Sequence, residues 1–226
     1  MNKSKLLILI FFLTSVVCLS QPVGQDVSSK KSKPTTWILS DFLQAGRTEF
    51  KILGKPEIVV CKYGNAVQFN GASDGIFLDQ MPLAGLKKFT LELLLCPAKG
   101  GNFEQRYFHS GEVKGNRVMM ELRSNTTDWY LDAFFKSGDQ QKALIETSLT
   151  HRLDQWAHVA FVVDRHKQQT FVNGHKELES KMEFQPFESG KTSVGVRQNE
   201  LSWFKGAIYQ IRITPKILKP SQFFKY

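Results

Sequence analysis

Two stretches of the chain decide the fold: Gln155-Trp156-Ala157-His158-Val159-Ala160-Phe161-Val162-Val163-Asp164 and, after it, Phe171-Val172-Asn173-Gly174. Residues 157–163 are almost all apolar, as in a strand that is buried on both faces. Asn173-Gly174 can adopt the two positive φ angles of a type I′ turn. The residues on either side of it, 169–172 and 175–178, are therefore predicted to form a β-hairpin.

The same strand signal recurs along the chain. Further strands are predicted where apolar residues alternate or run together, at 89–95, 117–123, 129–135, 192–197 and 207–213. Helical periodicity is nearly absent outside two short segments, 38–44 and 219–223. Many short strands separated by glycine turns predict an all-β fold, an antiparallel two-sheet jelly-roll sandwich. Its core is expected to include Leu91, Leu93, Val159, Phe161 and Val163.

Composition excludes several classes of protein. With 42% hydrophobic residues and 18 Phe, the chain is not disordered. The net charge of +9 comes partly from lysines near the N-terminus, and no basic stripe interleaved with aromatic residues follows in the predicted domain. Nucleic acid is therefore not an expected partner.

The N-terminal region predicts the localisation of the protein. Residues 1–20 resemble a secretory signal peptide, with Lys3 and Lys5 before an apolar run and cleavage near Gln21. A lipoprotein signal at Cys18 is the alternative, which Val17 disfavours. Residues 21–35 are read as a flexible polar linker and 36–226 as one domain. The mature protein is expected to be secreted, periplasmic or at the cell surface, and no second apolar run predicts a membrane span.

Cleavage would leave two cysteines, Cys61 and Cys96. In an oxidising compartment they could form a disulfide, and two free thiols within strands are the alternative. The sequence leaves both open.

Motifs that suggest catalysis have a plainer interpretation. Residues 71–75 spell G-x-S-x-G, but a strand rather than a helix is predicted to follow, so a turn is expected. Ser189-Gly190-Lys191-Thr192 lacks the first glycine of a P-loop. The five histidines form no pair with zinc-ligand spacing. The acids of the central strands, Glu92, Glu121 and Asp132, occur singly, which disfavours a glucanase. No catalytic residue and no metal site are predicted.

Several segments resemble a known family. The segment 64–71 resembles the G-x-A-x-x-F-x-G opening of laminin-G-like, concanavalin-A-like jelly-roll domains, and 88–92 resembles their F-T-x-E strand. Residues 155–164 are similar to W-x-H-V-A-x-V-x-D, 171–174 to Y-V-N-G, and 203–213 to the closing strand. The resemblance covers about 36–226. It implies a module that binds glycans or proteins; some relatives bind calcium, for which Asp74 lies in a suitable loop, and calcium is left open.

The favoured function is thus a secreted or cell-envelope carbohydrate-binding module. One alternative is a polysaccharide lyase acting on an acidic glycan, because residues 119–123 faintly resemble the R-x-E-L-R strand of such lyases. A protein–protein adhesion or scaffold domain that contacts another envelope protein is a third interpretation. Catalysis is the less favoured of these.

The predicted ligand-binding residues lie on three strands. Alternation places Met119, Glu121 and Arg123 on one face, with Tyr130 and Asp132 on a second strand and His109, together with Gln105 and Tyr107, on a third. The predicted site consists of His109, Glu121, Arg123, Tyr130 and Asp132. The alternative is a structural network in which these charges pair with one another across the sheet.

Overall fold

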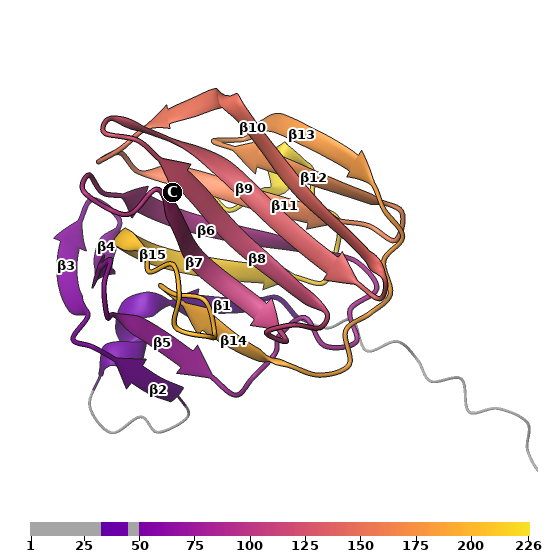
Figure 1. Cartoon of the computed structure of the whole chain (residues 1–226), viewed down its shortest axis with the longest axis horizontal. Coiled ribbons are helices and arrows are strands. Elements are labelled where there is room, and N and C mark those ends of the chain that lie inside the picture. Colours follow the sequence, from indigo (N-terminus) through magenta and orange to yellow (C-terminus); the bar gives the residue numbers. More distant parts are fainter. Residues whose placement is uncertain (1–32, 45–49) are drawn as a thin grey trace, which may run out of the picture. The chain divides into compact units, whose positions relative to one another are not determined.

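Two antiparallel sheets pack face to face in the part of the chain that the structure describes, residues 33–44 and 50–226 (Figure 1). The structure is a computed structural model. The predicted signal peptide and most of the predicted linker lie outside the described residues. Thr35, at the end of that predicted linker, already pairs with Ile213 in a strand.

The first sheet has eight strands. Seven of them run in the order β13-β12-β11-β6-β15-β4-β3, and β1 pairs with β15 beside β4. Their bounds are β1 Thr35–Ile38, β3 Glu57–Cys61, β4 Gly64–Asn70, β6 Phe89–Pro97, β11 Ala157–Val163, β12 Lys167–Val172, β13 His175–Lys181 and β15 Lys205–Thr214.

The second sheet has seven strands in the order β10-β9-β8-β7-β14-β5-β2. Their bounds are β2 Phe50–Leu53, β5 Gly75–Leu78, β7 Glu104–Gly111, β8 Arg117–Ser124, β9 Asp128–Ser137, β10 Gln140–Arg152 and β14 Lys191–Val194. Two short 3₁₀ helices, η1 (Leu39–Leu43) and η2 (Pro220–Gln222), lie where the sequence predicted its two short helical segments.

The core between the sheets confirms the predicted inward residues. Each of the following exposes none of its surface: Leu91, Leu93, Val159, Phe161 and Val163. The β12–β13 hairpin is also confirmed, since Asn173 and Gly174 have φ angles of 50° and 80°. The fold class predicted from the sequence, an antiparallel jelly-roll sandwich, is the fold that the structure has.

The outer face of the eight-stranded sheet is covered by the end of the described chain. Phe223 packs against Ala160 and Phe171 in a small apolar cluster outside the main core. Below this segment Glu92 is fully buried, and it pairs with Arg212 at 2.6 Å. Its other oxygen accepts the backbone N–H of Phe224 at 2.8 Å. The end of the described chain thus covers the part of this face formed by β6, β11, β12 and β15, whereas the predicted site residues lie on the strands of the other sheet.

We expect Val163→Asp to prevent folding, because it places a carboxylate without a partner in the core of β11. The loss of stability should exceed about 4 kcal/mol, the range of severe core substitutions. Ile145→Asp on β10, where the side chain is 39% exposed, serves as the matched control. Soluble yield and thermal unfolding measure both variants, and a cooperative melt of Val163→Asp near the control would show that the strand is misplaced.

Candidate functional site

The outer face of the seven-stranded sheet carries the polar residues that the sequence singled out. β8 and β9 send alternate residues inward as expected: Val118, Met120, Leu122, Leu131 and Phe135 are buried in the core. The strand register places Glu121 directly opposite Asp132, and Arg123 directly opposite Tyr130. Acids that occur singly in the sequence are thus neighbours across the sheet.

A β-bulge interrupts β7 between Arg106 and Phe108. Arg106 lies opposite Glu121, and Phe108 lies opposite Met120, the next residue of β8. β7 therefore has one residue more than β8 over this stretch, and the extra residue is Tyr107.

The bulge corrects the predicted faces of β7. The sequence placed Gln105 and Tyr107 on the face of His109, but both are fully buried, and the Tyr107 ring packs edge-on against Phe204 in the core. The physical reason is that one extra residue shifts the alternation of side chains by one position. Arg106 and His109 consequently share the outer face.

A loop, residues 195–204, lies beside the bulge where β14 would otherwise continue. The N–H of Gly195 donates to the carbonyl of Tyr107 at 3.1 Å, and the N–H of Arg106 donates to the carbonyl of Ser202 at 2.8 Å. The loop thus provides partners for backbone groups of β7 beyond the end of β14.

The loop also corrects a predicted strand. A strand was expected over 192–197, but β14 ends at Val194 and the chain turns at Gly195, whose φ is 81°. A Cβ at Gly195 would lie 2.3 Å from a ring carbon of Phe69, so only glycine fits there. Glu200 and Ser202 have φ angles of 58° and 59°, and such left-handed non-glycine residues occur often at functional loops.

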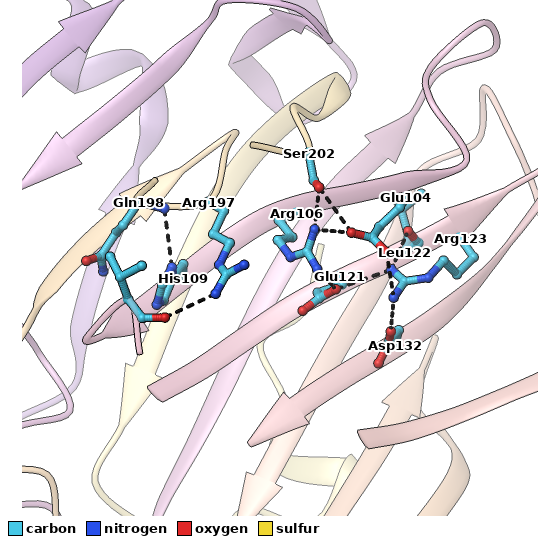
Figure 2. A network of polar contacts seen from close by, with 11 residues as sticks. Glu104, Arg106, His109, Glu121, Leu122, Arg123, Asp132, Arg197, Gln198 and Ser202 are labelled. Atoms are coloured by element: carbon cyan, nitrogen blue, oxygen red, sulfur yellow. Dashed lines mark hydrogen bonds and ion pairs between the residues drawn. The ribbon is translucent and has the colours of Figure 1, made fainter. Parts of the chain in front are cut away.

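Arg123 is the centre of a charged network on this face. Its guanidinium contacts Glu104 at 3.3 Å, Glu121 at 3.2 Å and Asp132 at 2.7 Å. The Arg123 side chain is 14% exposed, and Glu121 and Asp132 are almost fully buried. One guanidinium thus compensates three carboxylates from three adjacent strands (Figure 2).

Arg106 supplies the second positive charge. It pairs with Glu121 at 3.1 Å and contacts both Glu104 and the hydroxyl of Ser202 from the loop. Figure 2 shows Arg106 and Arg123 converging on Glu104 and Glu121 from neighbouring strands. The bulge and the loop together therefore complete the network.

The pKa values of the three carboxyl groups of the network shift in different directions, because burial and the arginine charges have opposite effects on them. Burial raises the pKa of both Glu121 and Asp132, and the positive charges of Arg106 and Arg123 only partly offset it. Burial also acts to raise the pKa of the more exposed Glu104, but the arginines outweigh it and lower that pKa. One oxygen of Asp132 is buried without a hydrogen-bond partner.

His109 lies farther along β7 and is held in one neutral form. Its Nδ1 accepts the backbone N–H of Gln198 at 3.3 Å, so that nitrogen carries no proton. Nε2 then donates to the carbonyl of Glu112 at 3.3 Å. Burial is the main cause that lowers the pKa of His109 to about 4, and the charges of Arg197 and Arg117 lower it further.

The five predicted site residues thus fall into two groups on one face. Glu121, Arg123 and Asp132 form a single network, with Tyr130 half-buried at its border. His109 belongs to a second cluster near the loop. The sequence missed Glu104, Arg106, Arg117, Arg197, Gln198 and Ser202. An alternation argument could not find Arg106, because no sequence signal marks the bulge.

Other candidate sites are accounted for by local bonding. Asp74, the residue considered for calcium, accepts the backbone N–H groups of Lys55 at 2.8 Å and Asn70 at 2.9 Å. Among residues 33–44 and 50–226, no three His, Cys, Asp or Glu side chains are placed to hold a metal ion.

Cys61 and Cys96 are free, half-buried thiols, and burial raises the pKa of Cys96 to about 11.

The two antiparallel sheets define a jelly-roll sandwich domain of the concanavalin A-like type. The chain belongs to the concanavalin A-like lectin/glucanases superfamily, whose sequence pattern matches residues 70–222. A sequence search of curated proteins gives no match. No helix within the described ranges is both long and apolar enough to cross a membrane.

Solved structures share the fold at low sequence identity. Domain 4 of AbnA, an extracellular arabinanase from Geobacillus stearothermophilus solved with arabinotriose, is 21% identical with a TM-score of 0.54, over 76% of this chain and 85% of that one. The binding domain of botulinum neurotoxin serotype D is 15% identical with a TM-score of 0.60, over 76% of this chain. The present chain spans only 44% of that domain's length. A pentraxin from Limulus polyphemus is 15% identical with a TM-score of 0.55, over 70% and 78% of the two chains.

The neutral state of His109 predicts a pH dependence of stability. Between its ordinary pKa of 6.5 and the folded value of about 4, the unfolded chain binds a proton that the folded chain does not. Stability from His109 is therefore complete above pH 6.5 and is lost as the pH falls toward 4, by up to about 1.4 kcal/mol per pH unit.

The variant His109→Gln measures this contribution. Glutamine keeps an acceptor for the Gln198 N–H but does not titrate. Denaturant unfolding of both proteins between pH 4 and 8 should show a difference in the free energy of unfolding that shrinks on acidification. Glu121 and Asp132, whose pKa values are raised, change stability with pH in the opposite direction. Both groups are present in the two proteins, so their effects cancel when the two free energies of unfolding are subtracted. Parallel pH curves would contradict the assignment.

Proposed function

We propose that the protein is a secreted glycan-binding module that binds its ligand on the outer face of the seven-stranded sheet. The observation that carries the proposal is the cluster of arginine, carboxylate and tyrosine side chains on Glu104–Gly111, Arg117–Ser124 and Asp128–Ser137. Sheet faces that bind sugars combine fixed charged hydrogen-bonding groups with an aromatic ring that stacks on the sugar.

The network supports binding because it is preorganised. Each of its arginines contacts at least two carboxylates, so the side chains are fixed before a ligand arrives. Tyr130 borders the network and is half-buried, so the residue is partly accessible from solvent. Ring and charges thus offer an apolar surface next to hydrogen-bonding groups.

Two structures of the same fold, each solved with a bound ligand, support a glycan as the ligand. The arabinanase domain was solved with arabinotriose, and the binding domain of botulinum neurotoxin DC, 10% identical with a TM-score of 0.58, was solved with SialylT. Such low identities show a shared fold alone, and a shared fold does not fix the ligand. We therefore propose a glycan as the ligand of this chain.

Binding is favoured over catalysis by the bonding of the titratable groups. His109 exposes none of its surface, and both of its ring nitrogens already have partners. It is therefore not placed to take a proton from a substrate, as a lyase base must. Glu121 and Asp132 are both held by Arg123 as ion pairs. Incubation with alginate, pectin and glucuronan, followed by absorbance of unsaturated uronates, tests the lyase alternative directly.

Tyr130→Ala is the test of the proposed face. Arg123→Ala is a poorer probe, because it leaves two buried carboxylates with fewer partners and should cost about 3–5 kcal/mol of stability. Loss of the Tyr130 ring should instead reduce binding in a glycan array roughly 10-fold, since stacking contributes about 1 kcal/mol or more, while thermal unfolding changes little.

The matched control for that experiment is Tyr226→Ala. Tyr226 is 51% exposed and packs on His158, on the outer face of the eight-stranded sheet. Its removal should leave glycan binding unchanged. Equal losses in the two variants, or an array without any bound glycan at millimolar concentration, would overturn the proposed face or the proposed function respectively.

Secretion is tested separately. We propose that cleavage before Gln21 produces the mature chain, on the strength of the apolar run at 6–17 and the small residues Cys18 and Ser20. Intact-mass measurement or N-terminal sequencing of protein from the native host should give Gln21 as the first residue. An acyl group on Cys18 would show a lipoprotein instead.

A further inference from the structure

Two arginines near His109 differ from those of the charged network. Arg117, the first residue of β8, donates to the carbonyl of Gly115 at 2.8 Å. Arg197, from the loop 195–204, donates to the carbonyl of Val113 at 3.1 Å. Both acceptors belong to the same turn between β7 and β8, so the two guanidinium groups gather at one end of the outer face. Figure 2 shows Arg197 beside His109 on this face.

Neither arginine forms an ion pair with a carboxylate within the part of the chain that the structure describes, although the more distant charge of Glu121 acts to raise the pKa of Arg117. Arg106 and Arg123 each contact at least two acids, whereas Arg117 and Arg197 bond only to carbonyl oxygens. The Nε of each is buried without a partner, as is the Nε of Arg106. The acid of the neighbouring turn, Glu112, accepts the hydroxyl of Ser189 instead.

The two guanidinium groups are close enough to repel each other. Burial lowers the pKa of Arg117, and the charge of Arg197 is the next cause of that lowering. The charges of Arg197, Arg117 and Arg106 likewise lower the pKa of His109 after burial. Of these three arginines only Arg106 has carboxylate partners, so an anion bound by Arg117 and Arg197 would offset the repulsion between those two groups.

The geometry also preorganises one of these groups. The Arg117 guanidinium lies over the ring of Phe134, 4.7 Å from its centroid, which fixes its plane. Both arginines are half-buried, so an anionic ligand from solvent can reach them. Guanidinium groups bind carboxylate and sulfate oxygens through two parallel hydrogen bonds.

We propose that the glycan bound at this face is acidic and that Arg117 and Arg197 bind its carboxylate or sulfate group. The inference rests on the proposed function and adds the class of ligand to it. The neighbouring sugar rings of the glycan would then extend over the charged network toward Tyr130, at the other end of β8.

The experiment compares acidic and neutral glycans on single-charge variants of the full mature chain. Polygalacturonate and hyaluronan supply carboxylates alone, dextran sulfate supplies sulfates alone, heparin supplies both, and arabinan and dextran are neutral. We expect Arg197→Gln and Arg117→Gln each to weaken binding of the acidic group roughly 10-fold or more, as for loss of a charge-assisted hydrogen bond. Binding of any neutral glycan should not change. The carboxylate and sulfate arms distinguish the two anions.

Arg165→Gln is the matched control, because Arg165 is an exposed arginine next to Lys87 and Lys88 on another part of the surface. It removes the same charge and should leave binding unchanged. If all three variants weaken binding of acidic glycans equally, the effect is general attraction of a basic protein for polyanions, and the inference is overturned.

A second readout does not depend on long polymers. Free glucuronate or sulfate should raise the melting temperature of the wild type by mass action and should not raise that of Arg197→Gln. Without ligand, Arg197→Gln should melt no lower than wild type, since it relieves the repulsion with Arg117. Binding of neutral glycans alone would overturn the inference and leave the proposed function intact, whereas no glycan binding at all would overturn both.

Discussion

One extra residue in β7 determines which charges reach the outer face of the seven-stranded sheet. Without the bulge at Tyr107, strict alternation would direct Arg106 and His109 to opposite faces, and a guanidinium would point into the core. Glu121, which is 2% exposed, would then depend on Arg123 as its arginine partner. A buried carboxylate that loses one of its partners is strongly destabilised, so the bulge contributes to the network by bringing Arg106 to Glu121.

The bulge also explains why a loop lies over this face. At the bulge, where β14 has ended, the N–H of Arg106 and the carbonyl of Tyr107 need partners, and the loop 195–204 supplies them. In doing so it brings Arg197 and Gln198 to His109, and Ser202 to Arg106. The position of Arg106 in the network and the loop contacts of His109 therefore lie next to the same irregularity of β7.

The two clusters suit different tasks. In the network, Arg106 and Arg123 are surrounded by carboxylates that fix them, and such buried pairs hold a surface rigid without attracting further charge. Near His109, Arg117 and Arg197 bond to carbonyl oxygens and form no ion pair within the described chain. A rigid support beside an unsatisfied charge is the arrangement that electrostatic recognition of a ligand requires.

The sequence alone determined the fold, because period-2 alternation, the apolar run at 157–163 and the Asn173-Gly174 turn are local signals that burial and backbone geometry enforce. It also placed Glu121, Arg123, Tyr130 and Asp132 on one face, since β8 and β9 pair without a register shift. It could not show that Glu121 faces Asp132, that Arg106 joins them, or that Arg197 reaches His109. Those depend on cross-strand register, on a bulge and on a loop from a distant segment, which are fixed only when the strands pack together.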